Sequence, residues 1–375
     1  MRIAQFNASL YREGPGVLLA DIRKGDAQVE AVAAIIRTVR PDILLLNEFD
    51  RDAEGRALDA FAALLARDGD APAGGGLETA GIAYTHRFHA PVNTGIPSHR
   101  DLDGDGETTG PGDAWGWGAF PGQYGMAVLS RHPIDRAAVR TWQHLRWHAL
   151  PGALRPVLPD GRWFHDEETW HLLRLSSKSH WAVPIEAPGG RLTLLAAHPT
   201  PPVFDGPEDR NGRRNDDEIR LLHAIATEPE ASWLMDDAGR AGGLATGTPF
   251  VIAGDLNADP VDGAARRDAL RTLLADPALQ DPRPSSDGAS EAASRQGDGN
   301  ARQSGSPAFD TADWRDSPGP GNLRVDYVLP SAGLEIVGSG VFWPAPGQPG
   351  AVLMDGGKRP ASSDHRLVWV DLRLP

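Results

Sequence analysis

The sequence predicts a single α/β domain, because short apolar runs typical of strands alternate with amphipathic segments typical of helices. A chain of 375 residues could hold one domain or two. However, we find no internal repeat and no linker between two independent cores. We therefore expect residues 1–375 to form one domain that carries two long loop insertions, at about 86–123 and 284–322.

The first part of the chain predicts strands and helices in alternation. Residues 2–10 (RIAQFNASL) alternate apolar and polar side chains, which indicates a strand. Residues 26–41 predict a helix, because apolar residues recur at the spacing of one buried face before a proline ends it. The run 43–46 is expected to be a buried strand, 57–67 a second helix, and 125–134 (GMAVLSRHPI) another strand.

The rest of the chain continues this alternation with less regular segments between. Strands are expected at 191–198, 250–257, 323–330 and 365–374, and helices at about 215–226 and 264–275. The stretch 142–181 is rich in Trp and His and gives no clear pattern. Residues 284–322 are dominated by Ser, Gly, Asp, Pro and Ala, which predicts a long mobile loop.

Composition excludes several classes of protein. The chain has no cysteine, so disulfides, thiolate nucleophiles and thiolate zinc sites are excluded. No run approaches the roughly 20 apolar residues of a membrane span. The opening MRIAQFNASL lacks the pattern of a signal peptide. The absence of cysteine slightly favours a secreted or periplasmic protein, with a cytoplasmic location still open.

The net charge of −14 opposes non-specific binding to nucleic acid, because cationic surface supplies most of that affinity. A bound cation could offset the charge locally. The charge therefore disfavours a nuclease without excluding it.

Polar groups suited to metal binding and catalysis lie at the ends of separate strand-like runs. They are Glu48 in ILLLNEF, His198 in LTLLAAHPTPP, Asp255 and Asn257 in FVIAGDLNADP, and Asp364-His365 in SSDHRLVWVDL. Side chains at i and i+2 share a face of a strand, so Asp255 and Asn257 point the same way. Hard oxygen ligands beside two imidazoles suit a divalent metal and an attacked phosphorus.

These segments resemble the endonuclease/exonuclease/phosphatase superfamily, which includes deoxyribonuclease-I-like enzymes. The matching segments are FNASL, LLLNEF, GQYGMAVLSRHPI, LLAAHPTPP, IAGDLNADP, RVDYVLP and SSDHRLVWVDL, which occur in the family's order from end to end. The resemblance implies a four-layered α/β sandwich, with two packed, mostly antiparallel sheets flanked by helices. It also implies one catalytic domain, a site at one rim of the sandwich, and in-line attack of water on phosphorus.

The resemblance implies a metal centre at Asn7, Glu48 and Asp364. Glu48 would be the main ligand, Asn7 would help it, and Asp364 matches a family aspartate close to the metal. The expected cofactor is Mg²⁺ or Mn²⁺, as one or two ions. An Asn that closes a first strand is also ordinary, so Asn7 is the weaker match.

The resemblance also implies the catalytic residues. Asp255 would orient or deprotonate the attacking water, and Asn257 and His198 would hold phosphoryl oxygens. His365 would face the scissile phosphate, with Asp326 as the carboxylate that fixes its tautomer. Taken singly, each of these residues could have a structural role instead, such as a turn for Asp-x-Asn. The occurrence of several of them at matching strand ends favours a functional site.

Asp101, Asp103 and Asp105 in the first insertion match the start of a calcium loop, with Gly106 at the sharp turn. The twelfth position of such a loop should be Glu, and here it is Gly112. A structural Ca²⁺ and a solvated acidic turn are both open.

Three further residues are candidates for contact with substrate. Tyr124 stands where the deoxyribonuclease branch carries a second glutamate, although a Tyr between glycines is often structural. Lys178 and His180 lie in SSKSHW, where hydroxyls, a cation and an imidazole suit an anion. The alternative for that cluster is a surface turn beside a buried Trp181.

The expected activity is metal-dependent hydrolysis of a small or extracellular phosphomonoester or phosphodiester by a monomeric protein. The first alternative is an endonuclease or exonuclease, which would need a cationic strip that the sequence lacks. The second alternative is a catalytically silent binding protein on the same scaffold, since one fold hosts many functions.

Overall fold

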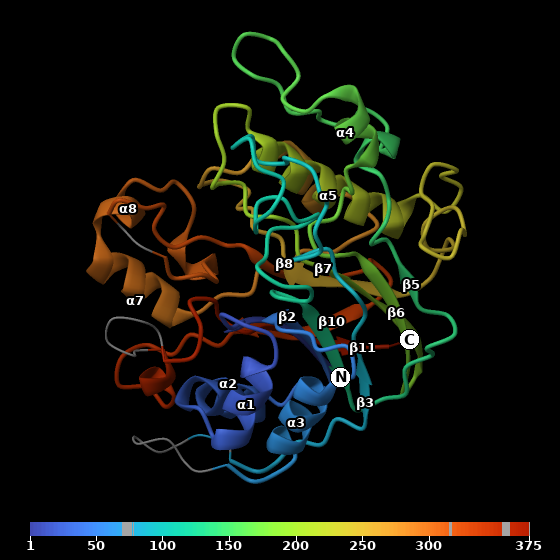
Figure 1. The fold of residues 1–375 in the computed structure, drawn as a ribbon. Helices are drawn as coiled ribbons and strands as arrows, with labels where there is room; N and C mark the ends of the chain where they lie inside the picture. The colour runs from blue at the N-terminus through green and yellow to red at the C-terminus, as the bar shows by residue number, and fades with distance from the viewer. Residues whose placement is uncertain (70–76, 78, 315–316, 355–360, 375) are drawn as a thin grey trace.

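The computed structural model describes residues 1–69, 77, 79–314, 317–354 and 361–374 (Figure 1). It contains two sheets, of six and five strands. The first sheet has the order β10 (Glu335–Val341), β11 (Val368–Arg373), β1 (Arg2–Leu10), β2 (Ile43–Phe49), β4 (Met126–Ser130) and β3 (His86–Phe88). The second has the order β5 (Arg140–Thr141), β6 (Trp181–Ala187), β7 (Gly190–Ala197), β8 (Phe250–Asp255) and β9 (Asp326–Pro330).

Both sheets are mixed but mostly antiparallel. Only the pairs β1–β2 and β7–β8 run parallel; the other neighbouring strands of the described residues are antiparallel. Each parallel pair is joined by a segment that contains a helix, as a parallel connection requires. The prediction of two mostly antiparallel sheets is therefore confirmed.

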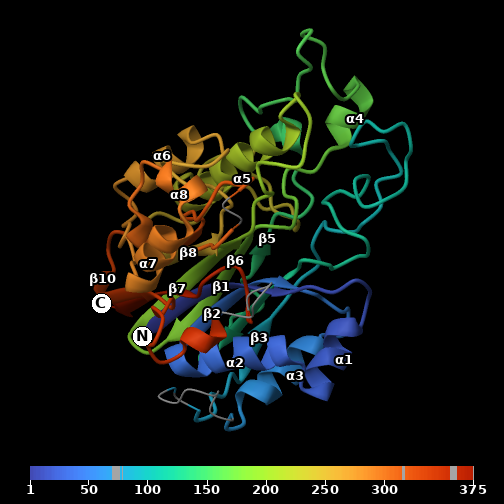
Figure 2. The same cartoon turned by 90° about the vertical axis from the view of Figure 1, so that its left-hand side faces the viewer.

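Helices cover the outer face of each sheet, which gives four layers (Figure 2). Those over the six-stranded sheet are α1 (Val17–Lys24), α2 (Ala27–Val39) and α3 (Arg56–Leu65). Those over the five-stranded sheet are α5 (Arg210–Thr227) and α6 (Asp268–Ala275). The remaining helices are α4 (Glu167–Leu172), α7 (Asp287–Gln296), α8 (Asp298–Ala301), and the 3₁₀ turns η1 (Trp147–Ala149), η2 (Pro307–Phe309) and η3 (Ala351–Leu353).

Three hydrophobic cores correspond to the three interfaces between the layers. Alternate residues of β2 divide between two of them: Leu44 and Leu46 pack with α2 and α3, whereas Ile43 and Leu45 pack against the second sheet. The third core joins the second sheet to α5 and α6 through residues such as Ile252. This explains why the strand sequences are almost continuously apolar, because both faces of each sheet are covered.

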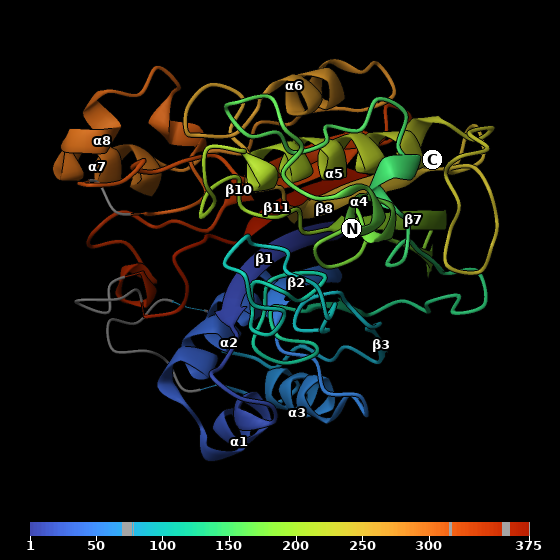
Figure 3. The same ribbon diagram turned by 45° about the horizontal axis from the view of Figure 1, so that its top comes forward.

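The prediction that residues 284–322 form one irregular loop is wrong, since α7 and α8 lie within it (Figure 3). The Ser286 side chain accepts a hydrogen bond from the Ala289 amide and so caps α7. Ala289, Ala292 and Ala293 form the buried face of that helix. Alanine gives only a weak hydrophobic pattern, so the periodicity is hidden in the sequence. The first insertion agrees better with its prediction, because the chain from 89 to 125 is irregular.

Helix α5 begins at Arg210, before the predicted start at Asn215 or Asp216. Its first turns are polar, and the side chain of the N-cap residue, Asp209, makes no capping hydrogen bond. None of the helices in the described ranges is long and apolar enough to cross a membrane.

Candidate active site

The ends of five strands meet at one edge of the sandwich. The parallel pairing of β1 with β2 places Asn7 opposite Asn47, next to Glu48. The parallel pairing of β7 with β8 places His198, which follows β7, close to Asp255. Asp326 begins β9 and is the antiparallel partner of Asp255. Strand direction and register therefore gather residues that lie far apart in the sequence.

Asp255 is the centre of this site and joins the two sheets. Its side chain is buried, and Oδ2 accepts a hydrogen bond of 2.9 Å from Nδ2 of Asn7. The same oxygen lies 3.5 Å from Nε2 of His198 and 3.7 Å from Nε2 of His365. Burial would raise the pKa of Asp255, but the charge of His365 and the hydrogen bond with His198 hold it below its usual range. Asp255 is therefore an ionised acceptor.

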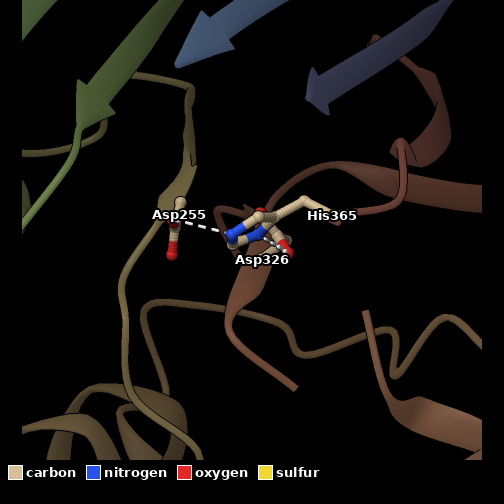
Figure 4. Close-up of side chains that lie close together, drawn as sticks. All are labelled: Asp255, Asp326 and His365. Carbon is tan, nitrogen blue, oxygen red and sulfur yellow. Dashed lines mark hydrogen bonds and ion pairs between the residues drawn. The ribbon is translucent and has the colours of Figure 1, made fainter. Parts of the chain in front are cut away.

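His365 lies between two carboxylates (Figure 4). Nδ1 is 2.9 Å from Oδ2 of Asp326, and Nε2 faces Asp255. Burial alone would lower the pKa of His365, but Asp326 and Asp255 raise it well above its ordinary value. The indole of Trp314 meets the imidazole edge-on, with ring centroids 5.5 Å apart. The imidazole is thus held as a cation in a fixed orientation.

His198 lies on the other side of Asp255 in a different environment. Its Nδ1 is buried and has no hydrogen-bond partner among the described residues. Burial and the charge of Lys178 lower the pKa of His198 to about 4. At neutral pH His198 is therefore a neutral imidazole.

Glu48, Asn7 and Asp364 form an acidic pocket beside Asp255. Burial and the repulsion from Asp364 raise the pKa of Glu48 to about 7, although a hydrogen bond from Asn7 opposes this. Oδ1 of Asp364 accepts a hydrogen bond of 3.0 Å from Oγ of Ser9. Two carboxylates that repel each other are hard oxygen donors of the kind that Mg²⁺ and Mn²⁺ prefer, whereas Asn7 turns its Nδ2 to Asp255 and its Oδ1 accepts from the Ser9 amide at 3.2 Å. The residues present therefore fit a divalent cation.

Asp255, Asp326 and His365 also offer ligand atoms within 4.8 Å of one another. A metal there would have to displace the proton of His365, since a protonated imidazole cannot be a ligand. The hydrogen bond between His365 and Asp326 favours the proton. No imidazole would have to lose its proton at the Glu48 pocket.

Four residues of the site have left-handed backbone conformations although they are not glycine. The φ angles are 47° at Ser9, 56° at Glu48, 53° at Tyr124 and 51° at Asn257. Such conformations cost about 1–3 kcal/mol each and persist where surrounding contacts hold them. At Asn257 the amide donates to Oδ1 of Asp255 at 2.8 Å, and Nδ2 donates to the Pro199 carbonyl at 3.0 Å.

Lys178 brings a buried cation to the site. Its side chain is 6% exposed, and the described residues give its Nζ no hydrogen bond and no ion pair within 4.0 Å. Burial lowers the pKa of Lys178, while Glu218, Glu48 and Asp255 act in the opposite direction. The ammonium group is therefore close to the site carboxylates and available to an anion.

His180 does not face the site, which contradicts the prediction that it contacts substrate. Both ring nitrogens are used: Nδ1 pairs with Oγ of Ser176 at 2.7 Å and Nε2 with the Glu218 carbonyl at 3.0 Å. Burial lowers the pKa of His180 to about 4. The side chain instead fixes the loop that presents Lys178. Adjacent residues in this irregular segment point in different directions, which sequence spacing does not reveal.

The acidic loop of the first insertion lies in a separate region. Asp101, Asp103 and Asp105 offer oxygens within 4.8 Å of one another. Asp101 accepts hydrogen bonds from the amides of Gly104 and Gly106, which is also the geometry of an acidic turn. The calcium site stays a prediction.

Sequence analysis missed several polar residues that position the site. Gln5 donates to Asn47 at 2.9 Å and to Asp326 at 3.0 Å, and Asn47 in turn accepts from the Asp255 amide at 3.2 Å. Thr311 accepts from the amides of Val325 and Asp326, both at 3.0 Å. A signal existed for Gln5 and Asn47, because buried amides are unusual inside apolar strands. Thr311 and Trp314 lie in a low-complexity segment, where the sequence gives no such signal.

Several solved structures align with this chain, and the first of the three described here, with a TM-score above 0.5, supports the fold. The endonuclease/exonuclease/phosphatase from Beutenbergia cavernae DSM 12333 aligns over 100% of this chain and 71% of its own, at 19% identity and a TM-score of 0.52. The mannosyl-6-phosphatase Bt3783 from Bacteroides thetaiotaomicron VPI-5482 aligns over 100% of both chains, at 12% identity and 0.46. Sphingomyelinase C from Streptomyces griseocarneus aligns over 99% of this chain and 98% of its own, at 15% identity and 0.45.

The family comparison is more direct. The search of curated proteins gives no significant match. The model of the Endonuclease/Exonuclease/phosphatase family matches residues 4–365, which includes every strand of the site. The chain therefore belongs to this family, whose members are hydrolases that act on phosphate esters.

Proposed function

We propose that the protein is a divalent-metal-dependent phosphoesterase that hydrolyses a small phosphate ester by in-line attack of water. The observation that carries the proposal is the Asp255 carboxylate, held between two imidazoles with opposite protonation and bonded to Asn7 of the acidic pocket. The ionised acceptor Asp255, the cationic imidazole and the metal pocket therefore lie together at one edge of the sandwich.

We assign Asp255 to the orientation of the attacking water. Its lowered pKa makes it a weak base, so its main contribution is to accept a hydrogen bond from the water and align it with the phosphorus. Asn257 and neutral His198 are placed beside it to contact phosphoryl oxygens. Lys178 and protonated His365 supply positive charge that meets the charge developing on those oxygens. Asp326 holds the His365 ring in place.

We assign the divalent cation to Glu48, Asn7 and Asp364. When bound, Mg²⁺ or Mn²⁺ would supply further positive charge to the phosphoryl group. The ion would also remove the repulsion between Glu48 and Asp364 that raises the pKa of Glu48.

A compact substrate agrees better with the charge of the molecule than a nucleic acid does. The net charge is −14, so long polyanions are repelled. We also propose that residues 1–375 act as one catalytic domain, because β1 and β11 from opposite parts of the chain pair in one sheet.

The test is turnover of p-nitrophenyl phosphate, bis-p-nitrophenyl phosphate and plasmid DNA with Mg²⁺, Mn²⁺ or Ca²⁺. A chelator serves as the metal control. We expect metal-dependent cleavage of a small ester and no cleavage of the plasmid. Asp255→Asn should lower kcat by roughly 1000-fold while circular dichroism stays unchanged, the order found for removal of a key polar group. Asp276→Asn, on the outer helical layer, is the matched control. Full activity of Asp255→Asn would refute the mechanism.

A further inference from the structure

We propose that Tyr11, Trp117 and Tyr124 form a subsite beside the metal pocket that packs against an uncharged ring in the substrate. This inference rests on the proposed function and adds the chemical class of the alcohol part. We call the three residues the aromatic row.

The three side chains form a continuous row of rings. The centroids of Tyr11 and Tyr124 are 4.6 Å apart with planes tilted by 38°, and those of Tyr124 and Trp117 are 5.7 Å apart with a tilt of 49°. Trp117 is 58% exposed and Tyr11 38% exposed. Single exposed aromatics are common on proteins, but three in mutual contact leave a row of ring surface in water.

The aromatic row lies next to the metal pocket. Tyr124 precedes Gly125, whose carbonyl accepts a hydrogen bond of 3.0 Å from the amide of Phe49. Phe49 directly follows Glu48 in β2. The charge of Glu48 also acts on the Tyr124 hydroxyl, together with burial and Tyr11, to raise the pKa of Tyr124. A phosphate held by a divalent cation at Glu48 would therefore place its substituent near these rings.

Buried polar contacts hold the backbone of the row. Oδ1 of Asp50 accepts from the Tyr124 amide at 3.1 Å, and Oδ2 accepts from the Arg12 amide at 2.7 Å. Nε2 of Gln123 donates to the Arg12 carbonyl at 2.8 Å. Asp50 and Gln123 are 6% and 4% exposed. Asp50, two residues after Glu48, therefore fixes the backbone at Arg12 and at Tyr124. The positions of the rings are fixed with it.

The surrounding charges select against a second anion. The charged groups that act most on Tyr124 are the carboxyls of Glu48, Asp50 and Glu13, so they offer a further phosphate no cationic partner. Arg12 does not offset them, because its Nε is bonded to Asp21 at 2.5 Å. Aromatic rings stack with uncharged rings whatever their hydrogen-bonding pattern. The fitting substrate is therefore a phosphate ester whose alcohol part carries an uncharged ring.

The experiment measures binding of phosphonates, which resemble the ester and are not hydrolysed, by calorimetry in the presence of Mn²⁺. The ligands are phenylphosphonate, methylphosphonate and 2-aminoethylphosphonate, which carry a ring, no ring and a cation. We expect phenylphosphonate to bind about 10-fold more tightly than methylphosphonate, the order of one ring-on-aromatic contact. In Trp117→Ala this ratio should fall to about 1, and Trp117→Phe should recover part of it.

Trp163→Ala is the matched control, because Trp163 is 56% exposed but packs under Arg155, outside the row. It should leave the ratio unchanged. Equal binding of phenylphosphonate and methylphosphonate, or tighter binding of 2-aminoethylphosphonate, overturns the ring subsite and leaves the phosphoesterase proposal in place. Absence of Mn²⁺-dependent binding for all three ligands overturns both.

Discussion

His198 and His365 flank the same carboxylate, yet their environments drive them to opposite protonation states. Their Nε2 atoms lie 3.5 Å and 3.7 Å from Oδ2 of Asp255, and both rings are buried. His365 has a second carboxylate, Asp326, at 2.9 Å, and its pKa is raised well above the ordinary value. His198 has Lys178 nearby instead, and burial together with that charge lowers its pKa to about 4.

This contrast shows that distance to Asp255 does not decide the charge of an imidazole here. Burial disfavours the proton on both rings, and the neighbouring groups then separate them: carboxylates retain the proton of His365, whereas the ammonium group of Lys178 adds to the effect of burial at His198. The site thereby obtains one cationic and one neutral imidazole from the same residue type at pH 7. The first two of the following changes each alter one of these neighbours.

The largest effect is expected from Asp326→Asn, which removes the carboxylate that keeps His365 charged. The pKa of His365 should fall, so the ring loses its proton at pH 7 and kcat/KM drops by roughly 100- to 1000-fold. The loss should shrink as the pH is lowered, because the ring regains its proton. Imidazole NMR and the pH profile of kcat/KM check this.

The control for Asp326→Asn is Asp276→Asn. Asp276 is the partner of His223 at 2.7 Å on the outer helical layer. A pH profile of Asp326→Asn that matches the wild type would show that Asp326 does not set the charge of His365.

A smaller effect is expected from Lys178→Met, which removes the cation beside His198. The pKa of His198 should rise from about 4 toward its ordinary value of 6.5. Loss of a charge that faces the phosphoryl group should also raise KM by about 10-fold. NMR titration of the imidazole and steady-state kinetics provide the two readouts. Lys24→Met, at an exposed helix end, is the control, and an unchanged His198 titration would rule out Lys178 as its cause.

Asp310 extends the comparison to a buried group whose neighbours carry its own charge. Its Oδ2 is buried without a hydrogen-bond partner in the described chain, and burial with Asp259 and Asp262 raises the pKa of Asp310 to about 8. The folded state therefore holds a proton that the unfolded state releases above its ordinary pKa of 3.8. Stability should fall as the pH rises between these two values.

Asp310→Asn should remove this loss of stability at high pH. We expect it to raise the free energy of unfolding by roughly 2 kcal/mol at pH 8 and by little at pH 4. Urea unfolding at several pH values measures the difference. A gain that does not grow with pH would show that the carboxyl is not held protonated.

The smallest effect is expected at the acidic loop, where three carboxylates lie together. If Asp101, Asp103 and Asp105 bind Ca²⁺, a chelator should speed proteolysis within residues 93–117 by about 10-fold relative to Ca²⁺ at ten times its Kd. Asp103→Asn should abolish this response. Equal cleavage with and without Ca²⁺ identifies the loop as an acidic turn.

The sequence was enough to locate the strand ends that carry the site, but not to predict which of their side chains become neighbours. Glu48, His198, Asp255 and His365 could be found because each lies at one end of an apolar run, and strand ends collect at the edge of a sheet. The opposite charges of the two imidazoles could not be foreseen, since they depend on Asp326 and Lys178 arriving from distant segments. His180 was misassigned for the same reason.

The helices and strands that could not be predicted are those whose hydrophobic pattern is weak or short. Helix α7 buries only alanines and one glycine, and α4 has six residues. Strand β10 is an edge strand with an exposed Val337, so its apolar pattern is incomplete. Packing against the rest of the molecule stabilises these segments more than their own sequence does.

The pairing of β1 with β11 has a consequence for how the enzyme is made. Asn7 and Glu48 leave the ribosome early, whereas Asp364 and His365 follow more than three hundred residues later in the chain. Until β11 docks, the flank of β1 is an unpaired edge that can recruit other chains. A nascent chain is therefore exposed to aggregation and lacks a complete candidate site. Completion of that site and protection of the central sheet come together in one late step of folding.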